Sequence, residues 1–347
     1  MYIKKILLAI VLIGLAVAAY FAYFVYGAMF SPNTAFESDT VSVYISRNDD
    51  YNDVRKELEP LLKDIEAFDA LANQKKYVNN VKSGHYIIEK GMTNNDIINT
   101  IRRKNIPVRV TFNNQETIGK LAGRIATQID ADSLALLKAM TDKTFLSDNG
   151  FKEETALGMY LPNSYELFWN SSAEGFRNRM LKEYKAFWTD SRKAKAKKLN
   201  LTEAEVIALA SIVYEESKQS KEQPRIAGVY LNRIRIGMPL QADPTIRFAA
   251  YKLPKYSNTV IKRVLNVHKE IDSPYNTYAN LGLPPGLIAM PDISAIDAVL
   301  NHEKHKYLYF VADAKRLGYH KFAKTLAQHN ANARAYHNYL SSQGIYK

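Results

Sequence analysis

The sequence predicts an α+β fold behind one N-terminal membrane-spanning helix, and three observations carry this prediction. The first is a long uncharged run, Ile6–Phe30. The second is a set of short segments with alternating apolar residues, typical of half-buried strands, scattered among segments with helical periodicity. The third is a helix-rich stretch from Ala173 to Ile236 with no internal repeat. Strands interleaved irregularly with helices indicate a mixed α+β protein rather than a solenoid or a parallel barrel.

The N-terminal run predicts a single transmembrane helix. An α-helix of about 20 apolar residues crosses a hydrocarbon core of roughly 30 Å, and Ile6–Phe30 is longer than this. Lys4 and Lys5 precede the run, and the next charges, Glu37 and Asp39, are acidic. This charge asymmetry places the N-terminus in the cytoplasm and the rest of the chain outside a plasma (inner) membrane. We therefore assign residues 1–30 to a cytoplasmic stub and a transmembrane helix.

A cleaved signal peptide is the alternative interpretation of this run. Residues Ala16–Ala18 match a small-residue cleavage pattern. The apolar run continues well beyond that point, which is longer than a signal peptide requires.

Composition excludes several classes of site. The chain contains no cysteine, so it has no disulfide framework, no thiolate nucleophile and no cysteine-bound metal. The formal net charge of +12 favours an anionic neighbourhood, such as lipid headgroups or a polymer that carries carboxylates. Nucleic acid is not an expected partner on the outer side of a membrane.

We expect residues 31–104 to form a linker and a small membrane-proximal α/β module. A Pro-containing polar linker, Ser31–Thr40, opens this region, and Thr93 with Asp96 predicts a capping box before a helix. The remaining expected elements are a strand at 41–45, helices at 51–62 and 67–73, and a strand at 83–88. This strand, helix, helix, strand, helix order resembles a LysM module, a fold associated with glycan chains. A spacer that only sets the distance from the membrane is equally compatible with the pattern.

We expect residues 105–347 to form a second, larger domain. Its expected elements are a strand at Pro107–Phe112, a helix at Gln115–Gln128, a buried strand at Tyr307–Ala312 and a helix at Thr325–Leu340. Ser273–Pro291 is rich in Pro and Gly and predicts a region with little regular structure.

One acidic residue in this domain falls on an apolar helical face. Thr202 and Glu205 form a capping box that begins a helix. At about 100° per residue, Glu216 projects between Leu209 and Ile212, whereas its neighbour Glu215 projects beside Ser211 and Ala208, on the polar side. A buried ionised carboxylate costs several kcal/mol or more, so Glu216 must be paired, protonated or placed in a cleft.

An ion pair with Arg225 or Arg233 is the alternative explanation for this acid. Burial without such a pair raises the pKa of a carboxyl group, which suits a general acid near neutral pH.

Polar side chains gather after this helix. Pro224 suits the first turn of the next helix, and Gly237 suits its C-terminal end. Amide, carboxylate and hydroxyl groups then occur close together and predict either contacts to sugar hydroxyls or simple turn chemistry; they belong to Asn232, Gln241, Asp243 and Thr245.

Four ordered segments resemble the YceG-like (MltG) family of endolytic murein transglycosylases. The longest runs from Ala210 to Thr245 and includes ASIVYEES and GVYLNRIRIGMPLQADPT. The others are GMYLPNSY at Gly158–Tyr165, the Pro274–Ile288 segment that begins PYNTY, and the Tyr307–Asn330 segment that begins YLYFV. The chain departs from the family pattern at Tyr214, Glu303, Asn163 and Ser164, which leaves the polarity of the cleft open.

The resemblance implies an enzyme, a lyase that cleaves the β-1,4 bond between N-acetylmuramic acid and N-acetylglucosamine. Glu216 matches the family's catalytic glutamate. It would protonate the glycosidic oxygen and then, as a carboxylate, accept the proton of the muramic C6 hydroxyl, which closes a 1,6-anhydro ring. This implies no cofactor and no metal. The expected sugar-binding positions are Asn232, Gln241, Asp243, Thr245, Tyr275, Asn276, Tyr278 and Glu222, of which Glu222 is expected to position Arg225 or the loop.

The family further implies that the enzyme terminates glycan elongation by cutting nascent strands near the membrane. Its implied partners are peptidoglycan strands and membrane-bound peptidoglycan synthases. Two alternatives remain open at this point. One is a water-using muramidase, with Glu216 as acid and Asp243 as base or nucleophile. The other is a non-enzymatic, membrane-anchored cell-wall adaptor.

Overall fold

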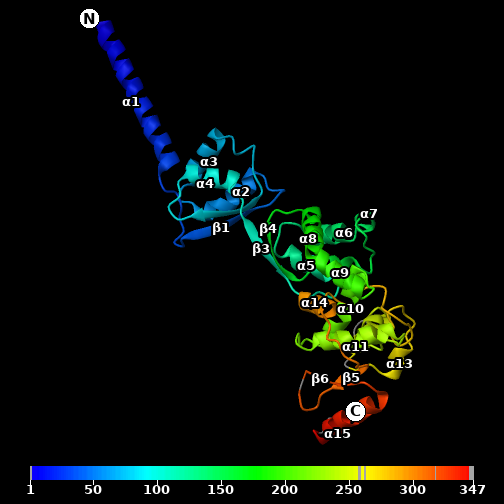
Figure 1. Ribbon diagram of the computed structural model, residues 1–347. Helices are drawn as coiled ribbons and strands as arrows, with labels where there is room; N and C mark the ends of the chain where they lie inside the picture. The colour runs from blue at the N-terminus through cyan, green and yellow to red at the C-terminus, as the bar shows by residue number, and fades with distance from the viewer. Residues whose placement is uncertain (1, 257–258, 262, 317, 344–347) are drawn as a thin grey trace. The chain divides into compact units, whose positions relative to one another are not determined.

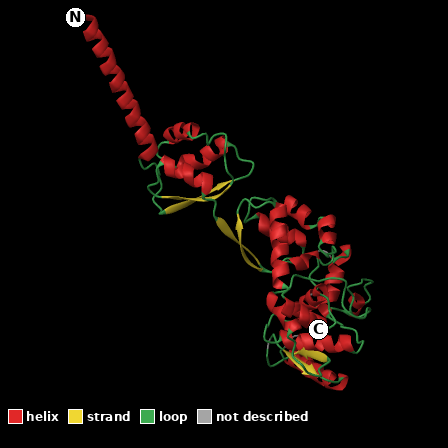
Figure 2. Cartoon of the chain, turned by 45° about the horizontal axis from the view of Figure 1, so that its top comes forward, coloured by secondary structure: helices red, strands yellow, loops and turns green. Residues whose placement is uncertain are grey.

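The computed structural model describes residues 2–256, 259–261, 263–316 and 318–343. The chain folds into two compact units (Figure 1). The first comprises residues 1–110 together with Gln128–Ala131 and Tyr165–Ser172, and the second comprises the remaining segments from Thr111 onward. Helices and strands are both present throughout (Figure 2), which confirms the predicted α+β class.

The first unit contains the five elements that the sequence predicts after residue 40. Strands β1 (Thr40–Ile45) and β2 (Gly84–Glu89) pair antiparallel, with Val43 opposite Tyr86. Helices of this unit pack on the pair and enclose one apolar core; they are α2 (Tyr51–Leu58), extended by η1 (Glu59–Leu61), α3 (Ile65–Gln74) and α4 (Asn94–Arg103). The predicted capping box at Thr93 and Asp96 is confirmed. The likeness of this module to LysM stays a prediction.

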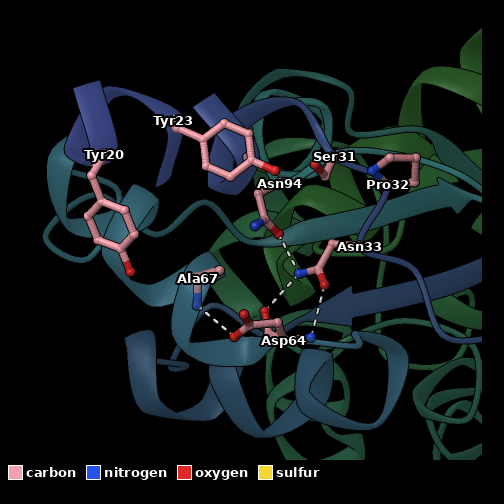
Figure 3. A pocket seen from close by; sticks show the side chains of 9 residues that line it. Tyr20, Tyr23, Ser31, Pro32, Asn33, Asp64, Ala67 and Asn94 are labelled. Atoms are coloured by element: carbon pink, nitrogen blue, oxygen red, sulfur yellow. Dashed lines mark hydrogen bonds between the residues drawn. The ribbon is translucent and has the colours of Figure 1, made fainter. Parts of the chain in front are cut away.

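The segment expected to be a simple linker is tied into the module. Asn33 is buried, and its amide nitrogen donates to the Asp64 carbonyl at 2.8 Å and to Asn94 Oδ1 at 2.7 Å (Figure 3). The Asp64 amide donates in return to Asn33 Oδ1 at 2.9 Å. These bonds satisfy both ends of a buried amide and join the chain after α1 to α3 and α4. A cavity of about 330 Å³ lies beside them, with Tyr20 and Tyr23 of α1 on its wall (Figure 3).

Helix α1 (Tyr2–Phe30) precedes the module. Its large apolar side chains are exposed, as at Ile13 (65%), Leu15 (62%) and Val17 (61%). Within the part of the chain that the structure describes, no helix combines the length and the apolar character that a membrane crossing requires. The span predicted over Ile6–Phe30 is thus not confirmed.

The second unit is mainly helical. Its own strands are β5 (Tyr309–Ala312) and β6 (His320–Ala323), which pair antiparallel. Strands β3 (Pro107–Phe112) and β4 (Asn163–Phe168) pair with each other, and each has residues in both units. Its helices up to residue 198 are α5 (Ile118–Ala126), α6 (Ser133–Met140), α7 (Lys143–Asp148), η2 (Ala156–Met159), α8 (Ala173–Phe187) and α9 (Asp190–Lys198). Those that follow are α10 (Glu203–Glu216), α11 (Gln223–Arg235), α12 (Asp243–Tyr251), η3 (Pro254–Tyr256), α13 (Asn266–Lys269), α14 (Ile293–Leu300) and α15 (Leu326–Ser342).

Helix α10 is the centre of this unit. The predicted capping box at Thr202 and Glu205 is confirmed. Every residue from Val206 to Val213 is buried, because α11, α12 and α14 all pack against this helix. The expectation of a polar side at Ala208 and Ser211 is wrong, since the Ser211 hydroxyl is fully buried and accepts a hydrogen bond from the Ile288 amide at 3.1 Å. A loop from far along the chain covers that face.

Two further sequence interpretations need correction. Turn chemistry is the alternative for Asp243 and Thr245, but both belong to the first turn of α12, where Pro244 is tolerated because the first amides of a helix have no partner within it. The strand expected to be buried at Tyr307–Ala312 is shorter and half-buried, because β5 pairs with β6 in a two-stranded sheet.

Candidate active site

Glu216 is the last residue of α10, and Ser217 follows in extended backbone conformation. The carbonyl groups at the end of a helix carry partial negative charge, which disfavours a second negative charge nearby. The residue retains partial solvent exposure, while its carboxyl group is surrounded by protein. The end of a buried helix therefore presents this acid at the base of a hollow.

The surroundings of Glu216 favour its protonated form. Burial is the largest effect, and it raises the pKa of Glu216 from its ordinary value to about 7. The negative charge of Asp243 acts in the same direction. A hydrogen bond from the Tyr230 hydroxyl to Glu216 Oε1, 2.7 Å long, lowers the pKa, as do the charges of His320 and Arg247. A carboxyl group of this kind is neutral in a large fraction of molecules near pH 7 and can still release its proton.

The neighbouring acid has different surroundings. Glu215 accepts a hydrogen bond from Lys218 at 2.8 Å and is partly exposed. The expected alternative, an ion pair between Glu216 and Arg225 or Arg233, is not observed among the described residues. Arg225 pairs with Glu303 at 2.9 Å. Arg233 donates to the carbonyls of Leu308 at 2.7 Å and Leu240 at 2.6 Å.

A cavity of about 310 Å³ opens at Glu216. Six segments of the second unit contribute to its wall: the end of α10, α11, the loop into α12 with its first residue, the loop that carries Tyr278, β5 and α15. The lining residues are Glu216, Tyr230, Arg233, Gln241, Asp243, Tyr278, Tyr309, Phe310, Leu326 and His329. Aromatic rings, amides and charged groups around one neutral acid form a surface suited to a polar ring compound such as a sugar.

Three of the predicted sugar-binding residues meet in this cavity, namely Gln241, Asp243 and Tyr278. The Tyr278 hydroxyl donates to Asp243 Oδ1 at 2.5 Å, and burial together with that carboxylate raises the pKa of Tyr278. Gln241 has a positive φ of 47° and donates its backbone amide to the Thr277 carbonyl at 3.0 Å. Its side chain is exposed at the cavity wall because this backbone bend turns the segment just before α12.

Three others lie outside the cavity, and the protein itself uses their polar atoms. Asn232 donates to the carbonyls of His305 at 2.9 Å and Tyr307 at 3.0 Å. Thr245 is fully buried and shares a hydrogen bond of 2.8 Å with Thr277. Asn276 donates to two backbone carbonyls and closes its own loop. These residues hold the segments that carry the cavity wall.

Tyr275 and Glu222 are likewise placed away from this cavity. The Tyr275 ring is buried and packs against Phe248, with 4.7 Å between ring centroids. The Glu222 carboxylate does not pair with the Arg225 guanidinium, which pairs with Glu303; it accepts from the His320 backbone amide and lies 2.8 Å from His320 Nδ1. It therefore fixes β6 rather than the position of Arg225.

The sequence does not predict the contact of Tyr230 with the acid, nor the place of Arg233 in the cavity wall. Arg233 was considered only as a possible ion-pair partner. Tyr230 lies fourteen positions from Glu216 in the next helix, as their contact records, so no spacing rule links them. Arg233 contributes a positive charge, and burial lowers the pKa of its guanidinium group.

The far wall of the cavity comes from β5 and α15. The Tyr309 ring stacks on His329 with 5.4 Å between ring centroids, and the Phe310 ring contacts Tyr230 edge-on at 5.9 Å. Burial lowers the pKa of His329. Within the described ranges, no group of three His, Asp or Glu side chains is arranged to hold a metal ion.

Comparisons with known proteins agree with one another. The sequence profile of the YceG-like family matches residues 43–335. The chain is 31% identical to the endolytic murein transglycosylase of Bacillus subtilis (strain 168) over 281 residues, which is 76% of this chain and 74% of the relative. It is 28% identical to the protein of the same name from Streptococcus pneumoniae (strain D39) over 353 aligned residues, which is 92% of this chain but 62% of the relative.

A solved structure is similar as well. The crystal structure of a YceG-like protein from Listeria monocytogenes matches with a TM-score of 0.56 and 25% sequence identity. The match covers 85% of this chain and 99% of the Listeria chain.

Proposed function

The chain belongs to the YceG-like family, and on that premise we propose that it is an endolytic murein transglycosylase whose catalytic acid is Glu216. Its substrate is peptidoglycan, and its product strands end in 1,6-anhydro-N-acetylmuramic acid. The single observation that carries the proposal is a carboxyl group with a pKa of about 7 that faces a cavity lined by aromatic and polar side chains.

The two carboxyl oxygens of Glu216 have different roles. Oε1 accepts the hydrogen bond from Tyr230, so Oε2 is the oxygen that carries the transferable proton. As the glycosidic bond breaks, this proton passes to the leaving oxygen of N-acetylglucosamine. Tyr230 then stabilises the carboxylate that forms.

The same carboxylate completes the reaction. It accepts the proton of the muramic C6 hydroxyl while the C6 oxygen bonds to C1, and the acid is regenerated. No water enters the product, and the bonds balance: one C–O bond breaks and one forms. A pKa near 7 serves both steps, because the group must donate a proton first and accept one afterwards.

Hydrolysis by a muramidase is the second candidate, and Asp243 is the observation that favours it. Its carboxylate lines the same cavity as Glu216. Glycosidases that use water employ two carboxyl groups on either side of the bond. Asp243 accepts a hydrogen bond from Tyr278, which occupies one of its oxygens. We favour the role of Asp243 as a charge that keeps Glu216 protonated.

We also propose that α1 attaches the enzyme to the plasma membrane, with the second unit on its outer side. Two features support attachment: the apolar side chains along α1 are exposed, and Tyr20 and Tyr23 lie near its C-terminal end, where tyrosine is common at membrane interfaces. An attached enzyme reaches only strands near the membrane, which suits a terminator of glycan elongation. Membrane-bound peptidoglycan synthases are the partners that this role implies.

Replacing the acid tests the proposal. Glu216→Gln preserves shape but removes the proton, so we expect cleavage of purified peptidoglycan sacculi to fall by about 10²- to 10⁴-fold. Glu174→Gln is the control, because Glu174 is an exposed acid in the first turn of α8 and does not line the cavity. Soluble muropeptides released over time are quantified by liquid chromatography. Equal activities for the two variants would remove Glu216 from the mechanism.

A further inference from the structure

A second and larger cavity, of about 420 Å³, begins one residue away from the first. Glu215 lines it where Glu216 lines the first cavity, and Pro244 lines it where Asp243 lines the first. The two cavities thus share the end of α10 and the first turn of α12.

The second cavity offers a cation that no acidic side chain contacts directly. The Arg247 side chain is half-buried on its wall and, among the described residues, makes no hydrogen bond or ion pair. The Lys252 Nζ atom lies 4.6 Å from the ring centroids of both Phe248 and Tyr275. These rings hold the lysine at the wall through cation–π contacts.

The acids of this cavity are already neutralised. Glu215 pairs with Lys218 at 2.8 Å. Glu116, which also lines the cavity, pairs with Lys120. The charge that remains for a ligand is therefore positive and belongs to Arg247 and Lys252.

A carboxylate on an extended, partly apolar chain is the ligand that fits these features. A guanidinium presents two parallel donors to a carboxylate, and partial burial strengthens such a pair. Ile288, Phe248 and Tyr251 provide apolar wall for the rest of the chain. In peptidoglycan, the muramic acid next to the bond that is cut carries a peptide with free carboxylates.

We propose that the second cavity binds this carboxylate-bearing stem peptide, with Arg247 as the residue that binds its carboxylate. The inference rests on the proposed function and adds a peptide subsite to the glycan site. The enzyme then prefers glycan strands that still carry peptides over strands from which the peptides have been removed.

Peptide binding at this place also supports the acid. The positive charge of Arg247 lowers the pKa of Glu216. A bound carboxylate neutralises that charge and shifts Glu216 toward its protonated form. Glu216 is therefore protonated in more molecules when the bound substrate carries its peptide.

Binding measurements on the inactive Glu216→Gln background test the proposal without cleavage. Two ligands are compared by calorimetry: a short glycan fragment with stem peptides, and the same fragment after an amidase has removed them. Adding Arg247→Gln should raise the Kd of the peptide-bearing fragment about tenfold or more, since hydrogen bonds between charged groups contribute about 1.5–3 kcal/mol. The Kd of the peptide-free fragment should change less than about twofold.

Lys255→Gln is the matched control, a nearby exposed cation that lines neither cavity. It should change neither Kd. If Arg247→Gln lowers the melting temperature strongly, Lys252→Gln in the same cavity makes the same comparison. Equal weakening of both fragments, or no weakening of either, would overturn the peptide subsite. The proposed function fails separately, if the unsubstituted enzyme cleaves neither kind of strand.

Discussion

At the scale of single residues, the chemistry depends on how two side chains share one proton. The Tyr230 hydroxyl lies 2.7 Å from Glu216 Oε1, and each group shifts the pKa of the other. Burial and the Glu216 carboxylate raise the pKa of Tyr230, whereas the tyrosine hydroxyl lowers the pKa of Glu216. Tyrosine therefore remains the donor. Its role is to moderate an acid that burial alone would hold more firmly protonated.

Removing this hydroxyl should move the pH profile in a defined direction. A hydrogen bond to the carboxylate favours the charged form, so its loss in Tyr230→Phe raises the pKa of Glu216 above about 7. The acid then stays protonated to higher pH, and the alkaline limb of kcat/KM shifts upward. The profile is measured between pH 5 and 9.

Tyr309→Phe is the control for this prediction, since the Tyr309 ring lines the cavity but its hydroxyl is not bonded to Glu216. A downward shift of the alkaline limb in Tyr230→Phe would show that the tyrosine acts in another way.

Individual residues also mark the limit of what the sequence predicts. Glu216, Gln241, Asp243 and Tyr278 were predicted and lie in one cavity. Asn232, Thr245 and Asn276 have the same chemical character, but their polar atoms are bonded within the protein. Residue type cannot distinguish a side chain that faces a cavity from one that supports its wall, because the difference lies in tertiary contacts.

At the scale of elements, the site depends on close approaches between loops and helices. Gly286 lies in the Pro- and Gly-rich segment that covers α10, and a Cβ there would lie 2.1 Å from the Glu154 carbonyl oxygen. The backbone at Glu154 cannot move as a flexible side chain would. Only glycine permits this contact.

Gly286→Ala should therefore destabilise the second unit by about 1–3 kcal/mol, as overpacked sites typically do. Gly123→Ala is the control, because Gly123 is in helix α5 and nothing lies within 4 Å of its added Cβ. Alanine favours helices over glycine, so this control should be neutral or stabilising. Urea unfolding compares the two. A Gly286→Ala protein as stable as the control would contradict the close packing of this loop.

Local signals predicted elements well where they depend on near neighbours. The capping boxes at Thr93 and Thr202 are local patterns, and both are confirmed. Helical periodicity was less reliable for α10, because that helix is buried on all sides. Its projection separated Glu215 from Glu216 correctly, but the exposed side that it implied is covered by the loop around Ile288.

At the scale of the whole molecule, the chain carries an exposed apolar helix, α1, in its first unit and the cavity at Glu216 in its second. The two share no residue, so each can be altered separately. Sequence predicted the α+β class and the element order of the membrane-proximal module. It did not predict that the segment after α1 is hydrogen-bonded into that module through Asn33.

Charges placed on α1 should detach the protein from membranes without affecting the catalytic unit. Ile10 and Ile13 are exposed, and a lysine at each costs about 2.5–3.5 kcal/mol in a bilayer. We expect the double variant Ile10→Lys, Ile13→Lys to lose flotation with lipid vesicles. Leu134→Lys, at an exposed apolar position of α6, is the control and should float as before. Unchanged flotation of the double variant would show that attachment does not depend on this surface.

The central claim is that one acid, Glu216, cleaves the glycan without consuming water. Digestion of sacculi in water enriched in ¹⁸O, followed by mass spectrometry of the released fragments, tests it most directly. The expected fragments have 1,6-anhydro ends that contain no ¹⁸O. Reducing ends that carry one ¹⁸O atom would contradict it and would assign Asp243 to the activation of water.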